Sequence, residues 1–398
     1  MDIERFGKSP SGKVIKVGEG EAAYRAFIPN PLPPKVEFDI ELILALSDAD
    51  RSLGELSGLG RNIPNPHLLM GPFIRREAVL SSRIEGTRAG ITDLYLYEAG
   101  QTSPSQPPDV REVSNYVKAL EYGLKRLETL PISLRFMREL HERLMEGVRG
   151  EYATPGSFRA SQNWIGPPGC SLNQATYVPP PVPQMQSSLA AFEEYIHAQD
   201  DLPPLIRIAL IHYQFEAIHP FLDGNGRIGR LLISLLLVHW GLLPLPLLYL
   251  SAYFEAHRQE YYELLMAISE RGGWHEWLTY FLRGVAEQAN DANTRAKRLQ
   301  DLQHQFQRQV RSLHASGLLL DLVDLLFESP GLTVPAAQRL LNTNFPTAQR
   351  NVDKLVKAGI LKEITGGQRN RFYLAPEILE VAGTLSPDDA INVFGRLC

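Results

Sequence analysis

The stretch His219-Pro220-Phe221-Leu222-Asp223-Gly224-Asn225-Gly226-Arg227-Ile228-Gly229-Arg230 decides the organisation of this chain, and the apolar run Leu231 to Val238 follows it directly. Pro220, Gly224 and Gly226 interrupt regular structure, and glycine lets a backbone approach a ligand closely. The second half has the composition of a buried helix. The sequence therefore predicts a loop that opens a helix, and the unpaired N–H groups at such a helix start can bind phosphate.

Four side chains of this stretch suit a nucleotide. Arg227 and Arg230 are three residues apart on the predicted helix, so both can reach the same anion. Asp223 offers a hard oxygen ligand for Mg²⁺, which proteins commonly share with phosphates. His219 has the side chain whose ordinary pKa suits a general base near neutrality. The alternative is a helix-capping turn with two solvated arginines, which leaves the joint spacing of these residues unexplained.

The pattern His-Pro-Phe-x-Asp-Gly-Asn-Gly-Arg-x-x-Arg, matched at every defined position by residues 219–230, resembles the signature of Fic (Fic/DOC) proteins. The resemblance implies a protein adenylyltransferase that moves AMP from ATP, with Mg²⁺, to a Ser, Thr or Tyr hydroxyl of a target protein, self-modification included. It implies that His219 is the base, that Asp223 holds Mg²⁺, and that Gly224, Asn225 and Gly226 bind phosphate oxygens. Arg227 and Arg230 would offset the charge of the leaving pyrophosphate.

A second motif ends the helix that we predict from His67 to Ile84. Its last residues, Ser81-Ser82-Arg83-Ile84-Glu85-Gly86, are similar to the Ser/Thr-x-x-x-Glu-Gly/Asn inhibitory motif of Fic proteins. The resemblance implies that Glu85 pairs with Arg230, which removes a charge meant for the γ-phosphate. Without the motif of residues 219–230, Ser81, Glu85 and Gly86 would be a solvated helix end with a glycine stop.

Residues 155–181 change character and predict a β-hairpin with a proline-limited edge strand, turning at Pro167-Pro168-Gly169. In Fic proteins the matching element is a flap that covers the nucleotide and aligns the target. By that resemblance Asn163, Trp164, Ile165 and Gly166 line the nucleotide side; the alternative is a hairpin that only shields the helical core. A tyrosine near Tyr261 contacts adenosine in the family, whereas a tyrosine on a helix is otherwise a packing residue.

The chain beyond residue 316 predicts a separate unit of three helices at 318–327, 334–341 and 345–358, followed by strands at 360–365 and 371–374 around Gly366-Gly367. This order resembles a winged-helix domain. Basic residues outnumber acidic ones between Arg339 and Arg371, so the unit could bind DNA. Dimerisation or docking of a target are the other readings. A basic face can also be ordinary solvated surface.

The fold class expected is mainly α, a Fic-type helical bundle with a β-hairpin flap followed by a winged-helix domain. Residues 1 to about 35 predict an extended arm. We expect four parts. Residues 1–108 form an N-terminal arm and the helices that carry the inhibitory motif, and residues 109–300 form a Fic catalytic core with the flap. Residues 301–316 form a linker helix, and residues 317–398 form the winged-helix-like domain.

Composition narrows the class of protein. With 398 residues, 44% hydrophobic and 21% charged residues and a net charge of −5, the chain reads as a globular protein and not as a general nucleic-acid binder. Two cysteines, Cys170 and Cys398, provide no disulfide framework. The first residues lack a signal peptide's apolar core, and Leu231 to Leu250 is interrupted by His239, Gly241 and two prolines. We expect a cytoplasmic protein with no membrane span.

Three rival functions remain open. A winged-helix transcription regulator with the Fic core as nucleotide sensor would bind an operator in an ATP-dependent way. A Fic enzyme with a different donor would differ around adenine, and Ser269, where relatives often carry asparagine, is one such departure. A reverse activity would remove AMP, with Glu85 positioning a water. The sequence leaves open the target protein, a homodimer, and inhibition within one chain or across two.

Overall fold

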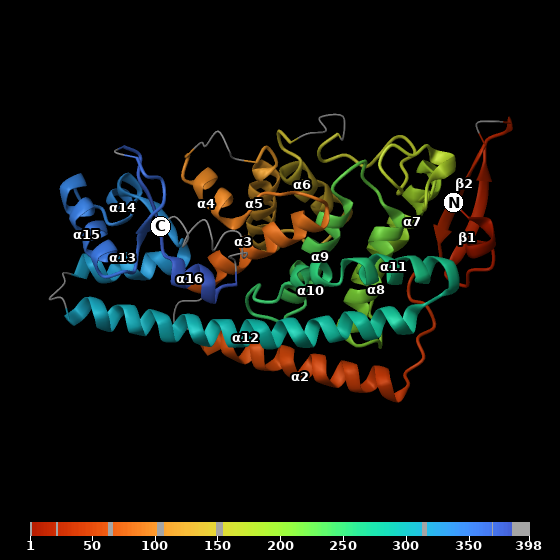
Figure 1. Ribbon diagram of the computed structural model, residues 1–398. Helices are drawn as coiled ribbons and strands as arrows, with labels where there is room; N and C mark the ends of the chain where they lie inside the picture. Colours follow the sequence, from red (N-terminus) through yellow and green to blue (C-terminus); the bar gives the residue numbers. More distant parts are fainter. Residues whose placement is uncertain are drawn as a thin grey trace. The chain divides into compact units, whose positions relative to one another are not determined.

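The computed structural model describes residues 2–20, 23–62, 67–101, 107–148, 154–312, 317–367 and 369–383. The prediction of a mainly helical fold is confirmed (Figure 1). The chain divides into two compact units, and each is discontinuous in sequence. Unit 1 comprises residues 1–54, 118–243 and 250–288, and unit 2 comprises residues 55–117, 244–249 and 289–398. The domain boundaries expected from the sequence remain a prediction.

Unit 1 is built around a helical core that the apolar runs of the sequence predict. Three helices contribute to both units: α2 (Ile40–Asn62), α5 (Val110–Arg126) and α12 (Trp274–Ser312). The other elements are α1 (Ile3–Phe6), β1 (Gly12–Val17), β2 (Tyr24–Pro29), α6 (Leu134–Leu144), η3 (Leu172–Gln174), α7 (Val182–His197), α8 (Pro204–Ile218), α9 (Asn225–His239), α10 (Ser251–Ala256) and α11 (Arg258–Arg271).

Helices α8 and α9 form the centre of unit 1, and they pack against each other (Figure 1). Both are apolar on nearly every side, and almost all of their residues are buried. A helix that is hydrophobic all round belongs inside a core rather than on its surface. α9 ends at His239 and Gly241 follows with φ +70°, so the helix-then-turn reading of Leu231 to Leu250 is confirmed. No described helix combines the length and apolar composition that a bilayer crossing requires.

The N-terminal residues differ from the extended arm that the sequence predicts. β1 and β2 form an antiparallel hairpin in which Gly12 lies opposite Pro29 and Val17 opposite Tyr24. Phe27 is fully buried and packs with Phe6 and Tyr177 at ring-centroid distances of 5.7 and 6.0 Å. The prolines and glycines that suggested an arm lie mostly at the ends of the strands, whereas the adjacent Ala26 and Phe27 within β2 are both fully buried and pack into two separate apolar clusters.

The flap is also less regular than the predicted hairpin. In the described residues of 155–181, one antiparallel bridge joins Ile165 to Tyr177, with N···O distances of 2.9 and 3.0 Å. A short 3-10 helix, η3, lies between the two bridged segments. The reason is composition, because a segment with six prolines loses six backbone donors that a strand ladder would use.

Unit 2 contains the parts of α2, α5 and α12 that unit 1 does not include, together with α3 (His67–Ile84) and α4 (Ile91–Glu98). Its C-terminal part consists of α13 (Gly317–Glu328), β3 (Gly331–Thr333), α14 (Val334–Leu340), α15 (Phe345–Lys357), β4 (Lys362–Glu363), β5 (Phe372–Leu374) and α16 (Pro376–Val381). α3 packs on α13. The three helices and the β4–β5 hairpin match the predicted order, whereas β3 was not predicted as a strand. β3 completes an antiparallel sheet in the order β3-β5-β4.

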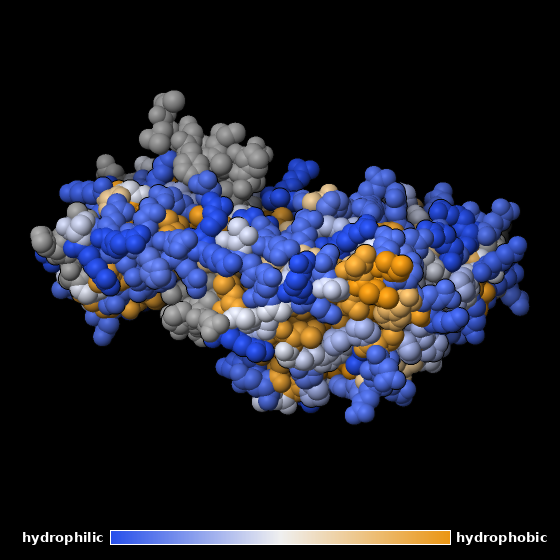
Figure 2. Space-filling view, turned by 90° about the horizontal axis from the view of Figure 1, so that it is seen from below, coloured by the Kyte–Doolittle hydropathy of each residue, from blue (hydrophilic) through white to orange (hydrophobic). Residues whose placement is uncertain are grey.

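The first turns of α2, within unit 1, expose an apolar stripe. Ile40, Ile43 and Leu44 are 79%, 50% and 60% exposed, and their spacing puts them on one helix face. Figure 2 shows apolar side chains gathered on the face of the molecule that carries this helix. The expected homodimer stays a prediction.

Candidate functional site

His219 lies directly after α8 in a backbone conformation that few residues adopt. Its φ is +49° and its ψ +61°, in the left-handed region, and its N–H donates to the Phe215 carbonyl at 3.0 Å. Such conformations cost free energy in non-glycine residues and cluster at functional sites. The Nδ1 atom lies 3.3 Å from the Glu216 carbonyl oxygen. A carbonyl only accepts, so this contact places the ring proton on Nδ1 and the lone pair on Nε2.

The loop ends where α9 begins, at Gly224. This residue is the N-cap with φ +78°, and a Cβ there would meet the Met145 Sδ at 3.1 Å. Glycine is therefore required both for the conformation and for the space. The N–H groups of Asn225, Gly226 and Arg227 belong to the first turn of α9, where helices have no internal acceptor. They give the loop the anion-binding geometry that the sequence predicts.

The side chain of Asn225 holds the loop closed. Its Oδ1 accepts from the Phe221 N–H at 2.8 Å, and its Nδ2 donates to the Phe221 carbonyl at 2.9 Å. Asn225 is 2% exposed. The sequence-based expectation gave this side chain to the phosphate oxygens, but the structure uses both of its polar atoms within the loop. It fixes the turn between His219 and α9.

Arg159 and Asn163, which precede the bridged Ile165 in the flap, donate hydrogen bonds to carbonyl groups of the same loop. The Arg159 Nε donates to the His219 carbonyl at 3.0 Å, and its backbone N–H donates to the Pro220 carbonyl at 2.9 Å. The Asn163 Nδ2 donates to the Phe221 carbonyl at 2.7 Å. Arg159 is 1% exposed, and burial lowers the pKa of its guanidinium to about 10. The two side chains fix the backbone on which His219 stands.

His141 on α6 supports the loop from the other side. Its Nε2 donates to the Asp223 carbonyl at 3.1 Å, and its Nδ1 accepts from the Gly156 N–H at 3.0 Å. Its ring stacks on Phe221 at 3.8 Å. Burial lowers the pKa of His141 to about 4, so the imidazole is neutral at physiological pH. A neutral ring is what this contact needs, because protonation of Nδ1 would remove the acceptor for Gly156.

This neutral histidine makes stability depend on pH. The folded-state pKa is about 4 and the ordinary value is 6.5, so the unfolded chain binds more protons between these pH values. Stability is therefore full above pH 6.5 and falls as pH drops toward 4. We expect His141→Gln to lose less unfolding free energy over this interval than the unaltered protein, by about 1–3 kcal/mol. Urea unfolding at pH 7, 5.5 and 4.5 measures it, and parallel curves would contradict the role.

Asp223 is the exposed carboxylate of the loop. Its Oδ1 accepts from the Gly224 N–H at 2.6 Å and lies 3.6 Å from the Arg227 Nη2, and its side chain is 56% exposed. The described residues contain no group of three His, Cys, Asp or Glu that could hold a metal ion by themselves. A single carboxylate suits Mg²⁺ when phosphate oxygens and water supply the remaining ligands. Asp223 fits that role.

Arg227 and Arg230 are both 2% exposed, although each is a cation. The Arg227 Nη2 also lies 3.8 Å from the Met145 Sδ. Burial, and secondly the nearby charge of Arg230, lower the pKa of His212 to about 3, so the imidazole beside Arg230 stays neutral. Two buried guanidinium groups in the first two turns of α9 contribute positive charge that favours an anion.

The remaining predicted residues of unit 1 lie in different surroundings. In the flap, Trp164 and Ile165 are 42% and 40% exposed, and the indole N–H donates to the Cys170 carbonyl at 3.0 Å. Gly166 packs so closely that a Cβ would lie 2.7 Å from the Cys170 Sγ. Tyr261 is 1% exposed, and its hydroxyl lies 2.8 Å from the His212 Nε2. This placement makes Tyr261 a core residue, as the packing alternative expects.

The predicted inhibitory residues belong to unit 2. α3 ends at Ile84 as predicted, and Gly86 follows with φ +96°. Ser81 is buried, whereas Glu85 and Gly86 are exposed. The N–H groups of Glu85 and Gly86 donate to the carbonyls of Ser82 and Arg83 and close the helix end. The pairing of Glu85 with Arg230 remains untested.

Two residues of the site were not found from the sequence. Arg159 lies within the predicted hairpin of residues 155–181, where no role was expected for it, and His141 lies in α6, which no motif marked as part of the site. The signal for Arg159 was weak, because a charged residue between Phe158 and Ala160 is commonly solvated. His141 lies on the apolar face of α6, next to the buried residues Phe136, Met137 and Leu140. Such a position marks burial, but it does not indicate which loop the ring supports.

Comparison with known families matches the two segments that carry these motifs. Residues 43–125 match the Fic/DOC family N-terminal model, and residues 131–237 match the Fic/DOC family model. The protein named protein adenylyltransferase Fic in Drosophila grimshawi is 31% identical over 146 residues, which are 36% of this chain and 27% of that protein. The protein of the same name in Nematostella vectensis is 28% identical over 210 residues, 51% of this chain and 44% of that one. This chain thus spans less than half the length of these relatives.

Two solved structures share the fold. A Fic family protein from Desulfovibrio desulfuricans G20 gives a TM-score of 0.55 at 19% identity, covering 86% of this chain and 98% of that one. A Fic domain containing signaling protein from Bacteroides thetaiotaomicron VPI-5482 gives 0.52 at 19% identity, covering 63% and 97%. At this identity the likeness concerns the fold alone.

Proposed function

We propose that the protein transfers AMP from ATP to a hydroxyl side chain of a protein, because residues 43–125 match the Fic/DOC family N-terminal model and residues 131–237 match the Fic/DOC family model. The observation that carries the proposal is the loop from His219 to the start of α9. It combines a base, an exposed carboxylate, backbone donors and two buried arginines within 12 residues of one unit. The names of the relatives support adenylyl transfer as the chemistry.

His219 acts as the base in this proposal. Nδ1 faces the Glu216 carbonyl, so Nε2 takes the proton of the target hydroxyl. The hydroxyl oxygen forms a bond to the α-phosphorus, and the bond from that phosphorus to the oxygen that bridges to the β-phosphate breaks. AMP stays on the target, and the leaving pyrophosphate takes the bonding electrons. The hydrogen bonds from Arg159 and Asn163 to the loop carbonyls hold His219 in its strained conformation while this occurs.

The first turn of α9 binds the phosphates. The N–H groups of Asn225 and Gly226 and the guanidinium groups of Arg227 and Arg230 offset negative charge as it grows on the departing pyrophosphate. Mg²⁺ would be held by Asp223 together with phosphate oxygens, and it would supply additional charge neutralisation there. Trp164 and Ile165, which the flap exposes, face solvent and are available to a nucleotide or an extended target segment.

Glu85 represses the transfer in this proposal by occupying Arg230, so that the γ-phosphate is not bound productively. The support is the motif at the end of α3, with Ser81 buried, Glu85 after the helix and Gly86 in a left-handed conformation. A glutamate also repels a triphosphate, and both effects act in the same direction.

Arg230→Ala is expected to weaken ATP binding by roughly 10- to 100-fold, because a hydrogen bond to a charged group contributes about 1.5–3 kcal/mol. The affinity is measured by calorimetry in a Glu85→Gly background, so that repression does not mask it. Arg230→Lys keeps the charge but lacks the planar guanidinium group. Its ATP affinity should lie between that of Arg230→Ala and that of the protein with Arg230 unaltered. Arg283→Ala, at an exposed arginine paired with Glu41 in unit 1, is the control. An unchanged affinity of folded Arg230→Ala would remove Arg230 from the site.

The C-terminal part of unit 2 supports a second role. Its element order, helix-strand-helix-helix-strand-strand, agrees with the proposed winged-helix domain. Arg350, Lys354 and Lys357 are exposed on α15, and Arg369 and Arg371 are exposed near the β4–β5 turn. A regulator would use this basic surface on DNA, and its DNA affinity would change with ATP and fall steeply with salt. If DNA affinity depends on neither ATP nor salt, the basic surface does not bind DNA as a regulator would. Docking of a target protein or of a second copy of the chain is then the role to test.

A further inference from the structure

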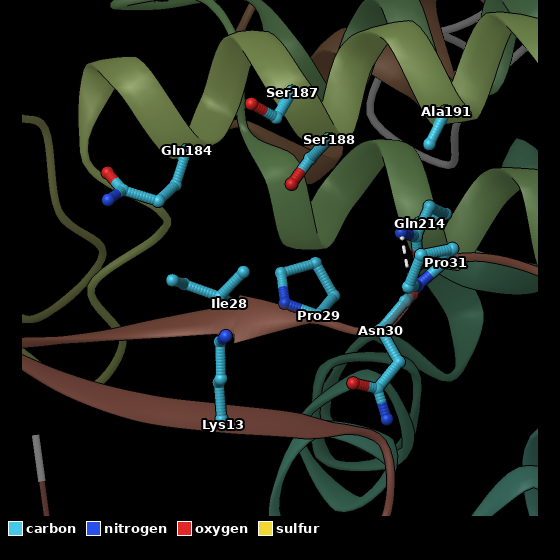
Figure 3. Close-up of a pocket in the computed structure, with 10 residues that line it drawn as sticks. All are labelled: Lys13, Ile28, Pro29, Asn30, Pro31, Gln184, Ser187, Ser188, Ala191 and Gln214. Atoms are coloured by element: carbon cyan, nitrogen blue, oxygen red, sulfur yellow. Dashed lines mark hydrogen bonds between the residues drawn. The ribbon is translucent and has the colours of Figure 1, made fainter.

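A pocket of about 320 Å³ lies within unit 1, between α7 and the end of β2 (Figure 3). Four residues of α7 line one side, and their spacing of three and four puts them on one helix face. Ile28, Pro29 and the two residues that follow β2 line the other side, with Lys13 from β1 and Gln214 from α8. The four α7 residues are Gln184, Ser187, Ser188 and Ala191. No part of the proposed AMP-transfer site lines it.

The charge of this pocket is positive. Among the described residues that line it, Lys13 is the only ionisable one, and none carries a carboxylate. Lys13 is exposed on β1, and within the described part of the chain it has no ion-pair partner. An ammonium group at the edge of a pocket without acidic residues favours an anion.

The pocket also contains hydrogen-bond acceptors that lack donors. Gln214 is 2% exposed, and its Nε2 donates to the Asn30 carbonyl at 3.1 Å. Its Oε1 is buried without a donor among the described residues, and the same holds for the Gln184 Oε1. A buried amide oxygen without a partner costs about 1–3 kcal/mol, so such groups are normally satisfied by a protein donor, an ordered water or a molecule that takes the water's place. A molecule here must therefore bring N–H or O–H donors.

The lining between the polar groups is apolar and narrow. Ile28, Pro29 and Pro31 lie along the groove opposite α7, with Pro31 on the side of Ala191, as Figure 3 shows. A volume of 320 Å³ is at the lower end of the range for small-molecule sites. The pocket therefore accommodates a compact molecule rather than a nucleotide or a long chain.

From these observations we propose that the groove between α7 and β2 binds a small carboxylate that also carries N–H or O–H donors. The carboxylate lies at the Lys13 ammonium, and the donors lie toward the Gln214 and Gln184 amide oxygens. The Ser188 hydroxyl is available to either end of the molecule, while the Ser187 hydroxyl lies 3.3 Å from the Pro183 carbonyl. This site is separate from the nucleotide chemistry, and it does not depend on the proposed transferase activity.

N-Acetylglycine is the probe, because it joins one carboxylate to one amide N–H. The full-length protein with isotope-labelled isoleucine methyl groups is titrated, and the Ile28 methyl resonance reports occupancy. We expect a saturable shift in the unaltered protein and in Lys16→Gln, an exposed lysine of the same strand that does not line the pocket. Lys13→Gln should bind at least about tenfold more weakly, since a charge-assisted contact contributes about 1.5 kcal/mol or more.

The neutral N-methylamide of N-acetylglycine, which keeps the N–H but lacks the charge, should cause no saturable shift. Both lysines are exposed, so neither variant is expected to disturb the fold. Absence of a saturable shift with N-acetylglycine would overturn the proposal. Equal affinities of Lys13→Gln and Lys16→Gln, or equal binding of the neutral amide, would also overturn it.

Discussion

His219→Ala abolishes label transfer from α-labelled ATP, and the expected loss is on the order of 10²–10⁴ or more, because this substitution removes the general base. ATP affinity should stay within about twofold, since the phosphates are bound by α9 and its arginines. The strained backbone calls for a second variant. His219 has φ +49°, and alanine resists the left-handed region, whereas asparagine adopts it readily.

His219→Asn therefore keeps the loop conformation and lacks the base. Both variants should lose transfer to the same extent while ATP still binds, as measured by calorimetry. His239→Asn, at an exposed histidine in the last turn of α9, is the matched control and should be active. If His219→Asn transfers AMP at the normal rate, the base is another group. If both variants lose ATP binding as well, His219 is a structural residue of the loop.

Glu85→Gly is expected to raise transfer by about tenfold or more, because it frees an arginine from a charge-assisted pair that contributes about 1.5–3 kcal/mol. The substitution lies after the last residue of α3, before Gly86, so the helix itself is spared. Glu85→Gln removes the charge and keeps the length, and it should also raise transfer. Glu128→Gln, at an exposed glutamate outside the motif, is the control.

Initial rates of label transfer to a target in cell lysate measure this effect. An unchanged or lower rate in both Glu85 variants would contradict repression by Glu85. Mixing Glu85→Gly with an excess of His219→Ala protein then separates inhibition within one chain from inhibition across a dimer. Only inhibition across a dimer lets the inactive protein, which retains Glu85, suppress the active one.

Strong local patterns let the sequence predict much of this fold. The end of α3 at Ile84 follows from Gly86, and the start of α6 follows from Ser133, whose Oγ accepts from the Phe136 N–H at 3.2 Å. The loop and α9 follow from the glycines and the apolar run after them. In each case residues adjacent in sequence determine the structure through capping or periodicity.

The misses have a common physical cause, which is contact between residues far apart in sequence. The β1–β2 hairpin depends on the packing of Phe27 against Phe6 and Tyr177. β3 forms because β5, about 40 residues later, offers it an edge. Arg159 and His141 act on a loop 60 and 82 residues away. Local propensity carries no information about such partners.

The phosphate role expected for the Asn225 side chain illustrates the same limit within the site. A sequence motif shows that an asparagine stands between two glycines, but it does not show where the amide points. In the structure both amide atoms bind Phe221, so the side chain fixes the loop. A fixed loop agrees with the proposed mechanism, because transition-state stabilisation requires donors that do not reorganise.

The most direct test of the central claim compares α-labelled and γ-labelled ATP with the Glu85→Gly protein, Mg²⁺ and cell lysate. AMP transfer predicts that protein bands take up the α-label and not the γ-label, that the unaltered protein labels them more weakly, and that Glu85→Gly/His219→Ala labels none. Uptake of the γ-label would contradict AMP transfer in favour of phosphoryl transfer. No α-label from Glu85→Gly would contradict ATP as the donor.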